Sequence, residues 1–147
     1  MGTVSSSAEG RFPPERFLEA LTEFGPGRSL IWGNSSDSLL EVHDRGDTWA
    51  EVTEGSKAAG IWQRYRYDWG TPGTVRLDVL ESNAFGPGSS WTYDIRATDS
   101  GCRVDLVIIR KPTTTKGRLV EPFLWLFGGL YFGRDLRRTM KRLESMS

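Results

Sequence analysis

A single change of hydrophobic period, at Pro112, constrains the fold of this chain more than any other feature of its sequence. Before Pro112, apolar and polar residues alternate with a period of two, which is typical of half-buried strands. Turn residues interrupt this alternation at short intervals, so the segment predicts six consecutive strands, over residues 38–43, 48–54, 61–69, 74–81, 89–97 and 102–111. After Pro112, apolar residues recur at helical spacing from Leu119 to Leu143. Strands joined by short turns form an antiparallel meander, and a long helix follows it.

The N-terminal part of the chain predicts one more strand and one or two short helices. Residues 3–8 are small and alternating, and Phe12-Pro13-Pro14-Glu15 is typical of a helix start. Gly25-Pro26-Gly27 ends that helix, and residues 28–32 allow one further helical turn. Because an antiparallel sheet needs a cover for its apolar face, we expect one α+β domain over residues 1–147. In it, a curved antiparallel sheet of about seven strands wraps around the long C-terminal helix.

The scarcity of cysteine and histidine excludes several kinds of site. Cys102 and His43 are each the only residue of their type among 147 residues. The chain can therefore form no intrachain disulfide and no zinc site with four Cys/His ligands. Any Ser-His-Asp or Cys-His catalytic apparatus would have to use His43. We expect no metal and no cofactor.

The charges balance overall but are unevenly distributed. Lys plus Arg is 19 and Asp plus Glu is 19, which argues against nucleic acid as a partner because such proteins usually carry a basic excess. Residues 1–109 hold 10 basic and 16 acidic side chains, whereas residues 110–147 hold 9 basic and 3 acidic ones. The longest apolar run, residues 119–132, is too short for a transmembrane segment of about 20 residues. With no targeting segment visible, we expect a cytoplasmic protein.

Several segments of the chain resemble a known superfamily. They are the opening Val4-Ser-Ser-Ser-Ala, the helix start Phe12-Pro-Pro-Glu-Arg-Phe, Trp49-Ala-Glu-Val-Thr-Glu-Gly, Gly101-Cys-Arg-Val-Asp-Leu-Val, and the closing helix over residues 130–143. In their order and spacing the chain is similar to the START/Bet v 1-like (SRPBCC) superfamily, and within it to the polyketide cyclase/dehydrase-like branch. The resemblance implies the helix-grip fold, with a deep cavity between the sheet and the long helix. It also implies apolar ligands such as lipids, polyketides or hormones, with catalysis in only some members.

Strand alternation predicts which side chains line such a cavity. Charged residues assign one face of each strand to solvent, so the opposite face points inward. The closing helix adds apolar side chains to the same cavity. The expected ligand-binding residues are Gln63, Tyr65, Tyr67, Trp69, Leu77, Trp91, Tyr93, Leu106, Phe123, Phe127 and Leu130. For residues 48–54 neither face is decisive, since Trp49, Glu51 and Thr53 oppose Ala50, Val52 and Glu54.

Two residues are weak candidates for acid or base catalysis. His43 is the only side chain that ordinarily titrates near neutral pH, but its neighbours Leu40 and Val42 fall on the opposite face of its strand. Glu51 is a better candidate if the face that carries Trp49 is the inner one, because an apolar cavity would raise the pKa of a carboxyl. Their alternative interpretation is a solvated surface residue.

The leading functional hypothesis is non-catalytic binding of a hydrophobic small molecule, lipid-like or polyketide-like, between the sheet and the helix. The first alternative is a cyclase- or dehydratase-type enzyme that uses cavity tyrosines and one acid or base. The second is a module that forms a homodimer or binds a membrane surface through Trp125 and Phe132 of the helix, with the basic residues 134–142 nearby. A cavity of negligible volume would contradict the leading hypothesis.

Overall fold

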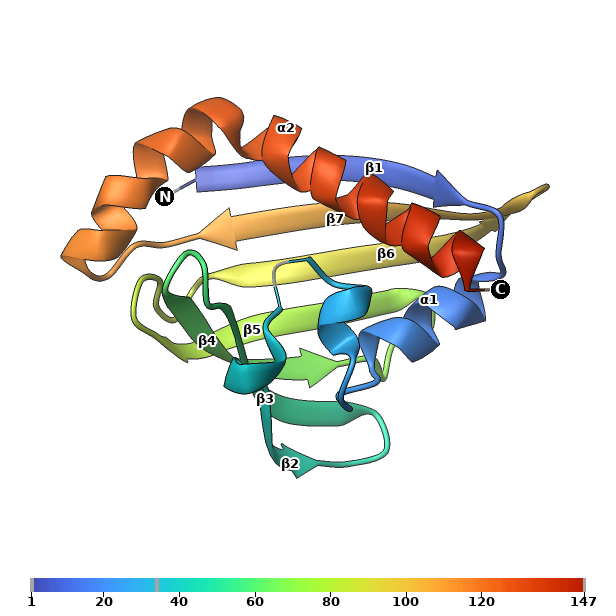
Figure 1. The fold of residues 1–147 in the computed structure, drawn as a ribbon, viewed down its shortest axis with the longest axis horizontal. Helices are drawn as coiled ribbons and strands as arrows, with labels where there is room; N and C mark the ends of the chain where they lie inside the picture. The colour runs from blue at the N-terminus through green and yellow to red at the C-terminus, as the bar shows by residue number, and fades with distance from the viewer. Residues whose placement is uncertain (1, 34, 147) are drawn as a thin grey trace.

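The computed structural model describes residues 2–33 and 35–146, with the side chains of residues 2, 124 and 125 left out. The strands are β1 (Gly2–Gly10), β2 (Glu41–Arg45), β3 (Trp49–Ser56), β4 (Ile61–Asp68), β5 (Thr74–Ser82), β6 (Ser90–Thr98) and β7 (Gly101–Arg110). The helices are α1 (Pro14–Leu21), α2 (Thr115–Ser145) and the short 3-10 helices η1 (Arg28–Leu30) and η2 (Asp37–Leu39). Figure 1 shows this arrangement, and the predicted change at Pro112 is the passage from β7 to α2.

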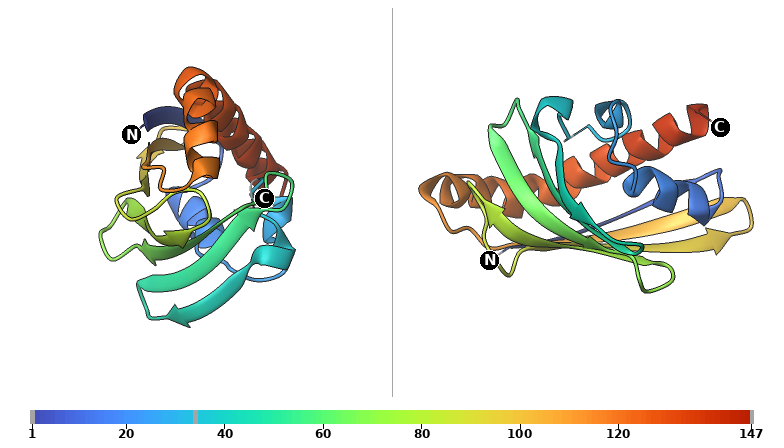
Figure 2. Two further views of the ribbon diagram at one scale, coloured as in Figure 1. Left: turned by 90° about the vertical axis from the view of Figure 1, so that its left-hand side faces the viewer. Right: turned by 90° about the horizontal axis from the view of Figure 1, so that it is seen from below.

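The seven strands form one antiparallel sheet in the order β1-β7-β6-β5-β4-β3-β2. Consecutive strands from β2 to β7 are neighbours, as a meander requires, and β1 joins the far edge beside β7. The sheet is strongly curved, and α1 and α2 lie on the same, concave side of it (Figure 2). The helix-grip α+β architecture expected from the sequence is confirmed.

One predicted strand is misplaced. Residues 38–43 were expected to be extended, but Asp37–Leu39 form η2 and the strand covers Glu41–Arg45 instead. β2 is an edge strand whose five residues are all exposed, and its register with β3 shifts between Val42 and Asp44. Because only one side of an edge strand is paired and neither face is buried, hydrophobic alternation specifies its limits weakly.

The two halves of α2 have different surroundings. The second half packs on the sheet through four buried side chains, Phe132, Leu136, Met140 and Leu143. The first half exposes apolar residues, among them Leu119, which is 76% exposed. The helix bends between the two halves (Figure 1), and Pro122 interrupts its hydrogen-bond ladder. Among the described residues, no helix is long and apolar enough to cross a membrane.

Gly128 marks the place where α2 comes closest to the sheet edge. A Cβ atom added there would lie 2.8 Å from Cγ2 of Val4 in β1, which is too close for a side chain. A Cβ on the neighbouring Gly129 would meet no atom within 4 Å. The first glycine therefore permits a close approach of helix and strand, whereas the second has no such packing role.

Candidate functional site

A cavity of about 300 Å³ lies between the concave face of the sheet, η1 and the first half of α2. Its walls are mainly apolar and aromatic. The lining side chains from the sheet are Glu54, Ile61, Gln63, Tyr65, Tyr67, Leu77, Trp91, Tyr93 and Arg110. The other walls come from Leu21, Arg28 and Trp32, from Phe85, and from Val120, Phe123, Tyr131 and Phe132 of α2. This volume is at the lower end of the range found for ligand sites, about 300–1,000 Å³.

The rim of the cavity joins the β3–β4 hairpin to the start of α2. Ala59 of the hairpin and Val120 and Phe123 of α2 line the cavity here. The Lys116 ammonium donates a hydrogen bond to the Gly60 carbonyl oxygen at 2.6 Å, and thereby ties the two segments together. Phe123 is both a lining residue and partly exposed, so it lies where the cavity meets solvent.

Seven of the expected ligand-binding residues do line this cavity. They are Gln63, Tyr65, Tyr67, Leu77, Trp91, Tyr93 and Phe123. The strands β4, β5 and β6 bury alternate side chains, and the buried set is the one opposite the charged residues. Strand alternation together with charge was therefore sufficient to place these sheet residues.

Four other expected residues lie outside the lining, which corrects their placement. Trp69 follows the end of β4 and is only partly buried, and Leu106 borders a separate, much smaller cavity. On α2, Phe127 is 50% exposed and Leu130 is 63% exposed. The prediction from helical spacing assumes that the whole of α2 packs on the sheet. In the structure, the first half of α2 exposes these two side chains to solvent.

Both catalytic candidates lie on the outer face of the sheet. The undecided strand β3 buries Ala50, Val52 and Glu54, so Glu51 points away from the cavity and pairs with Arg64 at 3.1 Å. His43 lies on the exposed edge strand, where its Nε2 is 2.7 Å from Oγ1 of Thr53. Neither residue lines the cavity, and the face of β3 that carries Trp49 and Glu51 is the outer one, so the condition set for Glu51 is not met.

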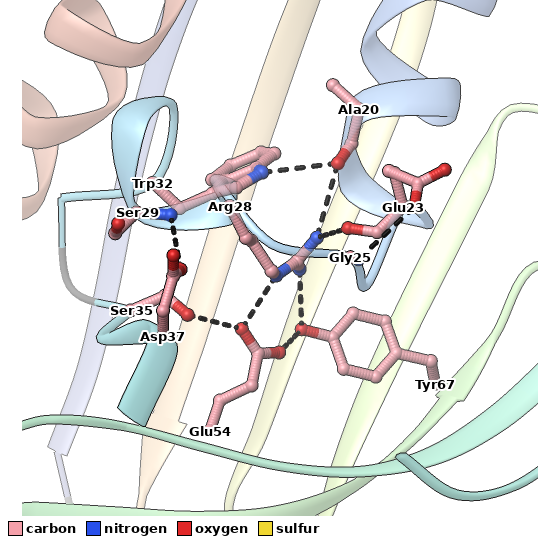
Figure 3. Close-up of polar contacts among 10 residues, drawn as sticks. All are labelled: Ala20, Glu23, Gly25, Arg28, Ser29, Trp32, Ser35, Asp37, Glu54 and Tyr67. Carbon is pink, nitrogen blue, oxygen red and sulfur yellow. Dashed lines mark hydrogen bonds and ion pairs between the residues drawn. The ribbon is translucent and has the colours of Figure 1, made fainter. Parts of the chain in front are cut away.

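The carboxylate that does reach the cavity is Glu54, which forms a buried cluster with Arg28 and Tyr67 (Figure 3). The Arg28 Nε donates to Oε2 of Glu54 at 2.9 Å, and the Ser35 hydroxyl donates to the same oxygen at 3.0 Å. The Tyr67 hydroxyl donates to Oε1 of Glu54 and accepts a hydrogen bond from Nη2 of Arg28 at 3.1 Å. Both oxygens of this carboxylate are thus engaged.

Arg28 is also bound to the backbone around α1. Its Nη1 donates to the carbonyl oxygens of Ala20 and Glu23, at 3.2 and 2.6 Å. The guanidinium lies over the ring of Phe24, 4.9 Å from its centroid. Burial opposes its charge, but the neighbouring Tyr67 and Glu54 outweigh this and raise the pKa of Arg28. The arginine therefore stays charged and joins α1, η1 and β3.

Local backbone geometry explains how Arg28 enters the cavity. Gly27 has a φ of 90°, in the left-handed region that favours glycine, and turns the chain after α1. The Asp37 carboxylate then accepts hydrogen bonds from the backbone N–H groups of Gly27 and Ser29, at 3.0 and 3.2 Å. These bonds lower the pKa of Asp37 and hold η1 against η2. The helical turn predicted at residues 28–32 is therefore held by the backbone turn at Gly27 and by the hydrogen bonds to Asp37.

A second buried arginine, Arg110, lies at the end of β7 and has few partners. Its guanidinium is 4.6 Å from the ring centroid of Phe85 and 5.0 Å from that of Trp91. Its Nε and Nη1 have no hydrogen-bond partner. Burial lowers the pKa of Arg110, and the nearby Tyr65 opposes this effect.

Sequence reasoning missed Arg28, Glu54 and Arg110, although a signal existed for two of them. Glu54 continues the period of Ala50 and Val52, and Arg110 continues the buried alternation of β7 that includes Val104. A charged residue at an inward position of a strand indicates a role other than contact with solvent. Arg28 offered no such signal, since it lies outside any alternating segment.

The three tyrosines that the sheet contributes to the cavity all have raised pKa values. Burial raises the pKa of Tyr65 to about 12. Burial also raises the pKa of Tyr67 and of Tyr93, and the adjacent Glu54 adds to the effect on Tyr67. At neutral pH these hydroxyls can donate hydrogen bonds but do not ionise.

Two remaining expectations concern metals and the helix aromatics. Among the described residues, no group of three or more His, Cys, Asp or Glu side chains could hold a metal ion. Phe132, which only the interaction-module alternative places in an exposed patch, is buried, and its ring meets that of Trp91 edge-on at 5.4 Å. The side chain of Trp125 lies outside the part of the chain that the structure describes.

Comparison with solved structures identifies the fold. The chain superposes on a protein from Thermus thermophilus with a TM-score of 0.77 and 18% identity, over 99% of both chains. A START superfamily protein from Mycobacterium smegmatis gives a TM-score of 0.73 at 11% identity, over 100% of both chains. The Zhui aromatase/cyclase from a Streptomyces species gives 0.70 at 14% identity, over 98% of this chain and 92% of that one.

The sequence itself matches no protein-family model and no curated protein. The likeness is therefore one of architecture. The chain has the helix-grip fold of START-like and polyketide cyclase-like proteins, as its sequence resemblance implied.

Proposed function

We propose that this protein binds a hydrophobic small molecule in the cavity between its sheet and α2, without converting it. The observation that carries the proposal is the cavity of about 300 Å³, with aromatic walls and a few inward polar groups. Ligand sites combine apolar walls with a small number of fixed hydrogen-bonding groups in this way. Its fold is shared with proteins described as START and aromatase/cyclase, which supports an apolar ligand.

The Arg28–Glu54–Tyr67 cluster supports binding over catalysis. Both oxygens of the Glu54 carboxylate already accept hydrogen bonds, from Arg28, Ser35 and Tyr67. A general base needs a lone pair free for the substrate proton, and these three donors take up three of the about four acceptor sites of the carboxylate. The raised pKa of Tyr67 likewise keeps its proton in place. The cluster therefore fits a role as a rigid wall of the cavity.

The proposal can be tested with an uncharged fluorescent probe, N-phenylnaphthylamine. We expect saturable fluorescence enhancement with the wild type. Leu77→Trp fills the cavity from β5 and should abolish it, whereas Leu80→Trp, on the same strand but facing outward, should leave it unchanged. Equal binding by the two variants would contradict the proposed site. Native mass spectrometry of protein purified from its own host would then identify a retained ligand.

An enzyme of the cyclase or dehydratase type is the second candidate, and one observation favours it. The Tyr67 hydroxyl and the Glu54 carboxylate meet within the lining, which places a proton donor beside an acceptor. Incubation with a linear poly-β-ketone tests this alternative. A binding protein returns the ketone unchanged, whereas an enzyme produces a ring that absorbs in the near ultraviolet and loses this activity on Tyr67→Phe.

The exposed apolar side chains of the first half of α2 support an interaction role beside ligand binding. They are Leu119, Phe123, Leu126, Phe127 and Leu130. Contiguous exposed apolar residues are typical of association surfaces. A homodimer that covers them remains a prediction, as do the cytoplasmic location and a single domain over residues 1–147. Sedimentation of wild type and Leu126→Lys checks the dimer, since only the wild type should associate.

A further inference from the structure

Most of the buried polar atoms that lack a partner belong to residues that line the cavity. In the described part of the chain there are five such side-chain atoms, in Gln63, Arg64, Trp91 and Arg110. Only that of Arg64, Nε, belongs to a residue outside the cavity lining. The other four are Oε1 of Gln63, Nε1 of Trp91, and Nε and Nη1 of Arg110.

Arg110 is the member of this group that needs a partner most. The residue is 7% exposed, and its guanidinium lies against the rings of Phe85 and Trp91. Cation–π contacts and a side-chain hydrogen bond with Tyr65 stabilise the charge, but Nε and Nη1 remain without a partner. A buried charge is costly unless it is paired and hydrogen-bonded, so proteins rarely keep one without a use for it.

The charges of the cavity leave Arg110 uncompensated. The ionisable side chains among the described lining residues are Arg28, Glu54, Arg110 and the tyrosines. Arg28 and Glu54 neutralise each other at 2.9 Å. Tyr65, which interacts with Arg110, has a raised pKa and is neutral at physiological pH. The cavity therefore carries one net positive charge, located at the end of β7.

We propose that the ligand is an amphipathic acid, with an apolar body and one carboxylate that pairs with the Arg110 guanidinium. This inference rests on the proposed function and specifies its ligand. Nε and Nη1 lie on opposite sides of the guanidinium, and either can donate a charge-assisted hydrogen bond to a carboxylate oxygen. A single compensating charge suits a carboxylate better than a phosphate monoester, which carries more than one negative charge at neutral pH. The indole N–H of the lining residue Trp91 is a second donor without a partner, and Oε1 of Gln63 can accept a bond from a ligand hydroxyl.

The test compares two probes that differ only in their head group, dodecanoate and dodecanol. Their dissociation constants are measured by displacement of N-phenylnaphthylamine at pH 8, where the acid is ionised. We expect the wild type to bind dodecanoate at least about tenfold more tightly, as for hydrogen bonds to a buried charge. Dodecyl phosphate is the third probe and should bind more weakly than dodecanoate.

Three variants assign the preference to Arg110. Arg110→Met removes the charge at similar volume and should reduce the ratio of the two affinities to about one, while dodecanol binding remains. Arg110→Gln should do the same if the methionine variant is unstable. Arg103→Met removes an arginine from the outer face of the same strand and should keep the full preference.

Each outcome separates the inference from the function on which it rests. Equal affinity of the wild type for dodecanoate and dodecanol overturns the acid as ligand and leaves the proposed function intact. An unchanged preference in both Arg110 variants, or tighter binding of dodecyl phosphate, also overturns it. Binding of none of the probes overturns both proposals.

Discussion

Two buried arginines face the same cavity, and they differ in how their charge is satisfied. Arg28 donates to Glu54, to Tyr67 and to two backbone carbonyl oxygens. Arg110 lies between two aromatic rings with Nε and Nη1 unbonded. The pKa of the first is raised and that of the second is lowered. The protein therefore supplies the partners of the first charge itself, and under our proposal a ligand carboxylate supplies the partner of the second.

A charge that finds its partner within the chain contributes to structure. Arg28 joins α1, η1, β3 and β4 through its bonds, and its loss would leave the Glu54 carboxylate buried without a positive partner. A buried charge without a partner forms no such bonds between elements. Its desolvation lowers the free energy of unfolding while the cavity is empty. Four experiments test this difference at the two arginines and at the tyrosines that interact with them. They follow in order of their expected effect on the free energy of unfolding.

Arg28→Met should cause the largest loss. Removing one partner of a buried ion pair costs about 3–5 kcal/mol of unfolding free energy, because the remaining charge stays desolvated. Urea denaturation followed by circular dichroism measures this loss. The double variant that adds Glu54→Leu removes both charges and should recover much of the stability. If Arg28→Met is as stable as the wild type, the Arg28–Glu54–Tyr67 cluster does not contribute to the stability of the fold.

Alkaline titration should destabilise the fold between pH 10 and about 12. Burial raises the pKa of Tyr65 to about 12 from its ordinary value of 10.0. The unfolded chain therefore loses this proton first, and stability that is complete below pH 10 falls as the pH rises to about 12. The loss is on the order of 2–3 kcal/mol for a shift of this size. Denaturation midpoints across this window measure it, and Tyr65→Phe should reduce the fall by about this amount, while Tyr67 and Tyr93 maintain the remainder.

Tyr67→Phe removes one member of the Arg28 cluster but neither charge. It deletes the hydroxyl that donates to Glu54 and accepts from Arg28, and the expected cost is about 1–2 kcal/mol. Chemical denaturation gives the value. Tyr131→Phe is the matched control, because that ring is half exposed at the surface of α2 and its stability should not change. Equal losses in the two variants would contradict a special role for the cluster.

Arg110→Met should have the smallest effect on stability, in spite of the burial of this side chain. We expect unfolding free energy within about 1 kcal/mol of the wild type, or higher, because the change removes an incompletely bonded charge from an apolar site. The difference between the unfolding free energies of Arg110→Met and Arg28→Met, measured under the same conditions, tests most directly whether the two arginines have different roles. A loss as large as that of Arg28→Met would mean that Arg110 is structural as well.

Much of the fold could be predicted because its signals are local. The alternation of β4 to β7 and the change of period after Pro112 need only neighbours along the chain. Charges such as Arg64 and Arg66 then decided which face of β4 is inside, and so placed Gln63, Tyr65 and Tyr67. Where charges lie on both faces, as with Glu51 and Glu54 in β3, the same reasoning could not decide.

The order of elements, the sheet and most of its inward face could be inferred from the sequence, since period and polarity are properties of adjacent residues. The folded chain was needed to show the pairing of Arg28 with Glu54, the unbonded Nε and Nη1 of Arg110, and the exposure of Phe127 and Leu130 on the first half of α2. These features depend on side chains that lie far apart in the chain and meet only when the sheet curves around α2. Whether a buried charge is paired is settled by that geometry, and no local pattern records it.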